Sequence, residues 1–205
     1  MKNPLNYQMT EYDCGPTSMA NAISFLFKRE EISPDIPKYI MQYCMDAYNS
    51  KGEAYKSGTT YYAMDFLASW LNHFGKVRRF PIHCETITGD QVYIGQNSRI
   101  TGCLQQKGVV VAKVMLGCGH YVLLTGIDGD YVDLFDPYFR QKPFNQKGIT
   151  MIWDEPKVRN RRVHKDLMNS TGKGAYAFSR IDWSESVLLY NRNTRQTMDQ
   201  IEYII

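Results

Sequence analysis

The chain has 205 residues, of which 43% are hydrophobic and 22% charged, and its formal net charge is +3. This length and composition are typical of a single soluble domain with a substantial core, and the mild charge argues against a nucleic-acid partner. No apolar run approaches the roughly 18 residues that a membrane-spanning helix needs. The N-terminus lacks the apolar segment of a signal peptide, so we expect a cytoplasmic protein.

The first third of the sequence predicts three helices from the helical spacing of its apolar residues. Ser33-Pro34 is typical of a helix start, and Thr59 or Thr60 is a suitable N-cap for the third helix. Gly75 follows the last apolar position of that helix, so we expect the helix to end near Phe74. The expected helices are 15–28, 36–47 and 59–74, with a polar loop over 48–58.

After Gly75 the pattern changes to that of strands. The segment 108–116 is strongly β-prone and is expected to be central in a sheet. The other expected strands are 76–82, 120–127, 131–136, 175–181 and 187–190, with a short helix over 99–106. Helices followed by antiparallel strands predict an α+β fold.

The segment 137–174 is long, polar and basic, with little periodicity. We expect a loop of the kind that is often functional or mobile. Its basic run, 159–165, is expected to be solvated.

Five cysteines at irregular spacing suit a reducing compartment better than a disulfide framework. Cys44 and Cys103 are expected to be buried as small hydrophobic residues. Cys118 and His120 form a Cys-x-His pair, but no second pair of ligands follows at the spacing of a zinc site. We therefore expect neither a metal nor an organic cofactor.

Cys14 stands at the start of the first predicted helix, with Gln8 six residues upstream. A helix start favours negative charge, so a thiol there ionises more easily, and the thiolate is the nucleophilic form. The amide of Gln8 is a suitable donor to a developing oxyanion. Taken alone, however, Cys14 also fits an inert thiol of the core.

His120 and Asp136 belong to a predicted β-hairpin whose turn signal is Asp128-Gly129. A three-residue turn with a bulge places His120 directly opposite Asp136, with Cβ atoms about 5 Å apart. A two-residue turn instead moves Asp136 to the other face. In the first register, Asp136 orients the imidazole of His120.

Cysteine catalysis needs a thiolate, an imidazole that acts as acid and base, a group that orients the imidazole, and donors to the oxyanion. Cys14, His120, Asp136 and Gln8 suit these roles in that order. The backbone N–H of Cys14 is a candidate for a second oxyanion donor.

The motif Gln8-x5-Cys14-Gly-Pro-Thr-Ser, together with Gly119-His120-Tyr-Val and Asp136-Pro137, resembles the bacteriocin-processing peptidases. These are papain-like cysteine peptidases that cut after a double-glycine leader and often precede a peptide-exporting transporter. The resemblance implies a papain-like α+β fold, with Cys14 as nucleophile, His120 as acid and base, Asp136 as orienting residue and Gln8 as oxyanion donor. It also implies a peptide or protein substrate and makes a separate transporter or secretion partner a candidate.

The chain departs from the family pattern in three segments. Insertions are expected near 28–58 and 138–174, and an extension at 192–205, within one domain over 1–205 that carries no transporter segment. The predicted activity is hydrolysis of a peptide bond through a thioacyl-enzyme on Cys14. An acyltransferase with the same triad, and a peptide-binding module without turnover, remain open as alternatives.

Overall fold

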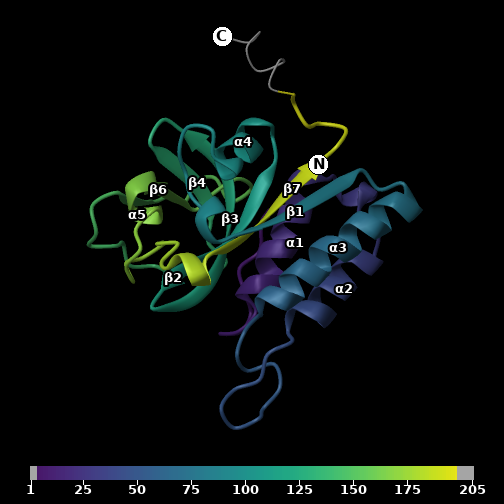
Figure 1. Cartoon of the computed structure of the whole chain (residues 1–205), viewed down its shortest axis with the longest axis horizontal. Coiled ribbons are helices and arrows are strands. Elements are labelled where there is room, and N and C mark those ends of the chain that lie inside the picture. Colours follow the sequence, from purple (N-terminus) through teal and green to yellow (C-terminus); the bar gives the residue numbers. More distant parts are fainter. Residues whose placement is uncertain (1–3, 198–205) are drawn as a thin grey trace.

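The computed structural model describes residues 4–197, in which helices pack on a seven-stranded sheet of order β1-β7-β2-β3-β4-β6-β5 (Figure 1). All neighbouring strands are antiparallel. The helices are α1 (Cys14–Leu26), α2 (Asp35–Cys44), α3 (Tyr61–Arg78), α4 (Arg99–Gln105) and α5 (Lys165–Met168). The strands are β1 (Ile82–Thr88), β2 (Val109–Leu116), β3 (Cys118–Asp128), β4 (Tyr131–Phe135), β5 (Ile149–Met151), β6 (Arg161–His164) and β7 (Glu185–Asn191).

The sheet is covered on both faces. On β2, Val109 and Val111 join the core formed with α1, α2 and α3, whereas Val110 and Ala112 join a second core that includes side chains of α4. All four side chains are 0% exposed, which explains why this strand reads as a continuous apolar run. The predicted arrangement of N-terminal helices on an antiparallel sheet is confirmed, and α1 packs on β3 near the middle of the sheet.

The third helix is longer than predicted, because Gly75 lies inside it. A Cβ atom at this position would lie 2.8 Å from the carbonyl oxygen of Phe80 and 2.9 Å from a methyl carbon of Ile82. Gly75 is therefore a site of close packing, and the helix ends before Arg79, which has a φ of 56°. The strand predicted over 76–82 is wrong, since the alternation there includes Val77, which is a 62% exposed residue of α3.

The segment 137–174 is not a structureless loop. It contains β5, β6 and α5, and β6 extends the sheet beside β4. The prediction that 159–165 is solvated is also wrong: Arg161 is 1% exposed. Arg159 and Arg162 both bind the carboxylate of Asp133, at 2.5 and 2.9 Å. The side chains around β6 are joined by these ion pairs, and the strand has no alternation of hydrophobic and polar residues. Hydrophobic periodicity therefore does not predict it.

The strand predicted over 175–181 is wrong as well. Tyr176 and Ser179 have φ angles of 65° and 66°, which an extended strand does not allow. The last predicted strand is confirmed as β7, between β1 and β2. Of the expected extension, 198–205 lies outside the described residues. Across 4–197, the helices lack the length and apolar character needed to cross a membrane.

Candidate active site

The loop before α1 is held by Asp13, which the sequence reasoning did not single out. Its buried carboxylate accepts hydrogen bonds from the backbone N–H groups of Met9 and Thr10, at 3.0 and 2.8 Å. Burial alone would raise the pKa of Asp13, but these donors and the Thr10 hydroxyl outweigh it and lower the pKa. An ionised Asp13 therefore fixes the chain where it enters α1, directly before Cys14. An acidic residue at a helix start was the available signal.

Cys14 is the first residue of α1 and is 7% exposed. Two contacts fix this end of the helix. Gly15 lies so close to Thr59 that a Cβ atom would come within 2.8 Å of the Thr59 Cβ. The hydroxyl of Ser18 donates to the carbonyl of Tyr121 at 3.0 Å, one residue after His120. The cysteine is thereby placed against β3 at the position of the histidine.

The β3–β4 hairpin differs from the predicted register. Asp128 pairs with Tyr131, so the turn has two residues and not three. A bulge then shifts the register: Gly126 pairs with Asp133 before it, and Leu124 with Leu134 after it. Without the bulge, a two-residue turn would place Asp136 on the opposite face from His120.

The extra residue of the bulge, Thr125, returns His120 and Asp136 to the same face of the sheet. The continued register puts His120 level with Tyr138, which makes Asp136 its diagonal neighbour. The two side chains meet with a distance of 2.7 Å between His120 Nε2 and Asp136 Oδ1. The predicted pair therefore forms, through a different register.

His120 is 6% exposed and Asp136 is 1% exposed. Burial opposes the charge on the imidazole, but hydrogen bonds and charge interactions with Asp136 and Cys14 raise the pKa of His120 to about 10. Since Nε2 is bound to Asp136, Nδ1 is the ring nitrogen left for the thiol. The arrangement suits an imidazolium held between a thiolate and a carboxylate.

Asp136 is supported by residues that the sequence reasoning missed. Its backbone N–H donates to Asn160 Oδ1 at 2.7 Å, and Asn160 Nδ2 donates to its carbonyl at 2.8 Å. Its carboxylate accepts from the N–H of Tyr138 and from the hydroxyl of Tyr176, at 2.8 and 2.7 Å. Burial tends to raise the pKa of Asp136, but His120 and these donors lower it. No local pattern in the sequence marks Asn160 or Tyr176.

Gln8 is joined to the site through its backbone, whose N–H donates to the carbonyl of Pro137 at 2.9 Å. Its side-chain Nε2 donates to the carbonyl of Thr10 at 2.7 Å, and its buried Oε1 has no hydrogen-bond partner among the described residues. The amide nitrogen carries a second hydrogen, so one donor is left over. The structure brings together Cys14, His120 and Asp136, and places Gln8 in the adjoining loop, where the hydrogen bonds of its amide nitrogen do not include the thiol of Cys14.

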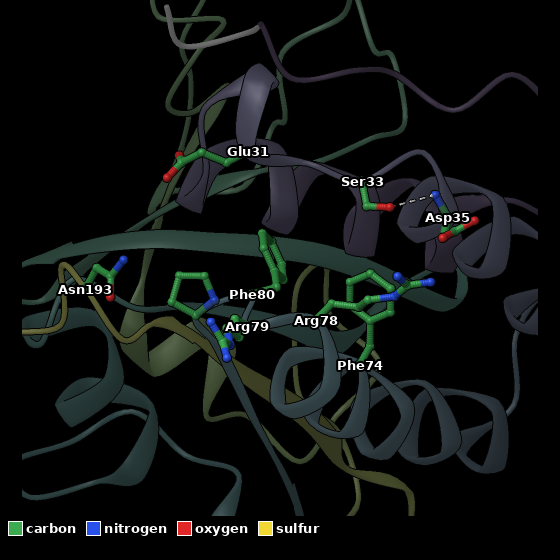
Figure 2. A pocket seen from close by; sticks show the side chains of 9 residues that line it. Glu31, Ser33, Asp35, Phe74, Arg78, Arg79, Phe80 and Asn193 are labelled. Carbon is green, nitrogen blue, oxygen red and sulfur yellow. Dashed lines mark hydrogen bonds between the residues drawn. The ribbon is translucent and has the colours of Figure 1, made fainter.

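Cys14 lines a cavity of about 420 Å³ between the helical half and the sheet. Its lining includes the loop residues Gly58 and Thr59, and Gly119 and Tyr121 of β3. A second hollow, of about 410 Å³, lies at the end of α3 and is lined by Arg78, Phe80 and Pro81, among other residues (Figure 2). No thiol or imidazole is among the described residues that line it.

The other cysteines differ from Cys14 in their surroundings. Cys44, Cys84 and Cys103 are buried, as predicted for the first and third. Burial raises the pKa of all three thiols, so they stay protonated and poorly nucleophilic. Cys118 is exposed at the rim of the cavity. Among the described cysteines, Cys14 is the one that interacts with a histidine, and this interaction helps to raise the pKa of His120.

The sequence matches the Peptidase_C39 like family over residues 2–155. Among solved structures, the chain is similar to the peptidase domain of Streptococcus ComA, a bi-functional ABC transporter involved in a quorum-sensing pathway. The two are 17% identical, with a TM-score of 0.47, over 91% of this chain and 97% of that chain.

The peptidase domain of Streptococcus mutans ComA is 15% identical, with a TM-score of 0.43, over 91% of this chain and 98% of that chain. A double glycine motif protease from an AMS/PCAT transporter, solved with the leader peptide, is 12% identical, with a TM-score of 0.42, over 91% and 89%. No curated protein matches the sequence.

The family match covers well over half of the chain and confirms the resemblance that the motifs around Cys14 and His120 indicated. The chain therefore belongs to the Peptidase_C39 like family of cysteine peptidases, which have a papain-like α+β fold.

Proposed function

We propose that this protein is a cysteine peptidase that hydrolyses a peptide bond through a thioacyl-enzyme on Cys14. The observation that supports it most is the chain of contacts Cys14–His120–Asp136, which opens on one side into the cavity of about 420 Å³. Each member has the chemistry that its role requires: a nucleophile, an acid and base, and a carboxylate that orients the imidazole.

In the first half of the reaction, the Cys14 thiolate attacks the carbonyl carbon of the peptide bond and forms a tetrahedral intermediate. The imidazolium of His120 then gives its Nδ1 proton to the leaving amine as the C–N bond breaks. The acyl group remains on Cys14 as a thioester.

In the second half, water attacks the thioester carbon while His120 accepts a proton from it. The carbon–sulfur bond breaks, the carboxylic acid leaves, and the thiolate–imidazolium pair is restored. Asp136 keeps Nε2 protonated throughout, so that Nδ1 is the nitrogen that exchanges protons with the reactants.

The oxyanion of each tetrahedral intermediate requires donors near Cys14. The backbone N–H of Cys14 lies in the first turn of α1, where an amide has no acceptor within the helix. The remaining hydrogen of the Gln8 amide is the second proposed donor. The first hydrogen of that amide is bound to the carbonyl of Thr10.

The test compares the parent protein with Cys14→Ala on a peptide library made by digestion of a bacterial lysate, with mass spectrometry of the products. We expect new peptide ends with the parent and none with the variant. Cys103→Ala, which removes a buried thiol of the other core, is the matched control and should cleave like the parent. Cleavage by Cys14→Ala would assign the nucleophile to another residue.

A further inference from the structure

Both oxygens of the Asp136 carboxylate are occupied. Oδ1 accepts from His120 and from the backbone N–H of Tyr138, and Oδ2 accepts from the hydroxyl of Tyr176 at 2.7 Å. Asp136 is 1% exposed and Tyr176 is 0% exposed. The hydroxyl of Tyr176 is therefore the group that fixes the side of the carboxylate turned away from His120.

The surroundings of the Tyr176 hydroxyl determine which way its hydrogen points. A carboxylate only accepts hydrogen bonds, and a guanidinium only donates them. The hydroxyl oxygen lies 2.7 Å from Oδ2 of Asp136, which can only accept, so the hydrogen of the hydroxyl is directed at Asp136. Burial, followed by the neighbouring carboxylate, raises the pKa of Tyr176 well above its usual value, with Arg161 acting in the opposite direction. The phenol stays protonated and remains a donor.

Arg161 is a buried charge that forms no ion pair with a carboxylate among residues 4–197. It is 1% exposed, and its Nη1 donates to the carbonyl of Asn160 at 2.8 Å. Within the described residues, its Nε and Nη2 make no hydrogen bond. A buried guanidinium in such a position is costly. Its neighbour Asn160 brackets the Asp136 backbone, and the positive charge of Arg161 lies close enough to lower the pKa of Tyr176.

The backbone of Tyr176 is held in an unusual conformation. Its φ is 65°, in the left-handed region that residues other than glycine rarely adopt. Two backbone bonds to Met115 of β2 hold the segment, one from the N–H of Tyr176 at 2.7 Å and one to the carbonyl of Ala177 at 2.8 Å. The preceding residue of β2, Val114, pairs with His120. Strain of this kind persists where the surrounding structure enforces it.

We propose that Tyr176 is a positioning residue, whose hydroxyl holds Asp136 in the orientation that pairs it with His120. This inference rests on the proposed function. The titratable or charged groups around the Asp136 carboxylate are His120 of β3, Arg161 of β6 and Tyr176. Cys14 of α1 lies beyond the imidazole. Tyr176 and Arg161 both lie outside the matched range of the family, 2–155.

The experiment measures alkylation of Cys14 by iodoacetamide as a function of pH, by mass spectrometry, in the parent and in Tyr176→Phe. The variant keeps the ring and removes only the donor. A carboxylate held on one oxygen stabilises the imidazolium less, and the imidazolium then stabilises the thiolate less. We expect the pH midpoint of alkylation to rise by about one unit, with a roughly ten-fold slower reaction at a pH below both midpoints. Tyr190→Phe, at a tyrosine that is 3% exposed in the same core, is the matched control.

A second variant separates positioning from a general loss of structure. In an Asp136→Asn background, Tyr176→Phe should produce no further shift of the midpoint, because the hydroxyl acts through the carboxylate. Circular dichroism at neutral pH checks that each variant is folded.

A midpoint in Tyr176→Phe equal to that of Tyr190→Phe, or a full additional shift in the double variant, would overturn the role of Tyr176. The parent reports separately on the proposed function. If Cys14 of the parent reacts no faster than the exposed Cys118, the proposed function itself is overturned. A fast parent with an unshifted Tyr176→Phe overturns only this inference.

Discussion

Asp136→Asn removes the charge at the centre of the proposed site and keeps the shape of the side chain. Asp136 accepts from His120 and Tyr138 on one oxygen and from Tyr176 on the other. An amide offers a single oxygen, so an NH₂ group must face either His120 or Tyr176. One of these donors then loses its acceptor, and an NH₂ group at His120 favours the wrong tautomer of the imidazole.

The magnitude follows from two contributions. A hydrogen bond to a charged group contributes about 1.5–3 kcal/mol, and about 1.4 kcal/mol corresponds to a ten-fold change in rate. The lost bond alone therefore predicts a fall in kcat of roughly 10- to 100-fold. In addition, burial lowers the pKa of His120, and Asp136 is the first of the two partners that raise it to about 10. Without the carboxylate, the imidazolium is not maintained at neutral pH, and the fall in kcat should reach at least about 100-fold.

The assay is peptide hydrolysis at neutral pH with the substrate that the library screen identifies, and kcat and KM are determined separately. KM should change little, because Asp136 does not line the cavity at Cys14. Thermal unfolding of the variant controls for loss of structure. A folded Asp136→Asn protein with the parent's kcat would show that Asp136 only shapes the chain before Pro137 and does not orient His120.

Three further predictions concern single features of the site. Gln8→Ala should lower kcat by about 100-fold and leave alkylation of the nucleophile unchanged, because an oxyanion donor acts only in the transition state; a parent-like kcat would exclude this role. Gly15→Ala should lower the free energy of unfolding by about 1–3 kcal/mol in urea titrations, because its Cβ would lie 2.8 Å from the Cβ of Thr59; an unchanged midpoint would mean that the two segments separate easily. The raised pKa of His120 stabilises the fold fully below its ordinary value of 6.5, and this contribution is lost as pH rises through about 10. The difference in unfolding free energy between the parent and His120→Gln should therefore shrink over that range, and a constant difference would contradict the assigned charge.

The sequence predicted those parts of the fold that local patterns determine. The starts of α1 and α3 and the strands β2, β3 and β7 follow from periodicity and capping residues. The end of α3 did not follow, because Gly75 is a glycine for packing against Phe80 and Ile82 and not for a left-handed turn. A glycine at a helix end and one at a close contact look alike in a single sequence.

The candidate site shows a similar division. Cys14 at a helix start and His120 paired with Asp136 were predicted, but the register was wrong, since the bulge at Thr125 has no local signature. Tyr176 and Asn160 bind Asp136 from segments far along the chain. This region contains charged residues and residues with a left-handed backbone, so hydrophobic periodicity does not predict its structure. Only the tertiary fold brings these groups together.

The most direct test of the proposed mechanism is to trap the acyl-enzyme. The parent is mixed with the cleaved peptide, quenched in acid within the first turnover, digested and examined by mass spectrometry. A thioester adduct on the fragment that contains Cys14, absent in His120→Ala, is the predicted result. An adduct on Cys118, or continued turnover with no adduct on any cysteine, would contradict the proposal that Cys14 is the nucleophile.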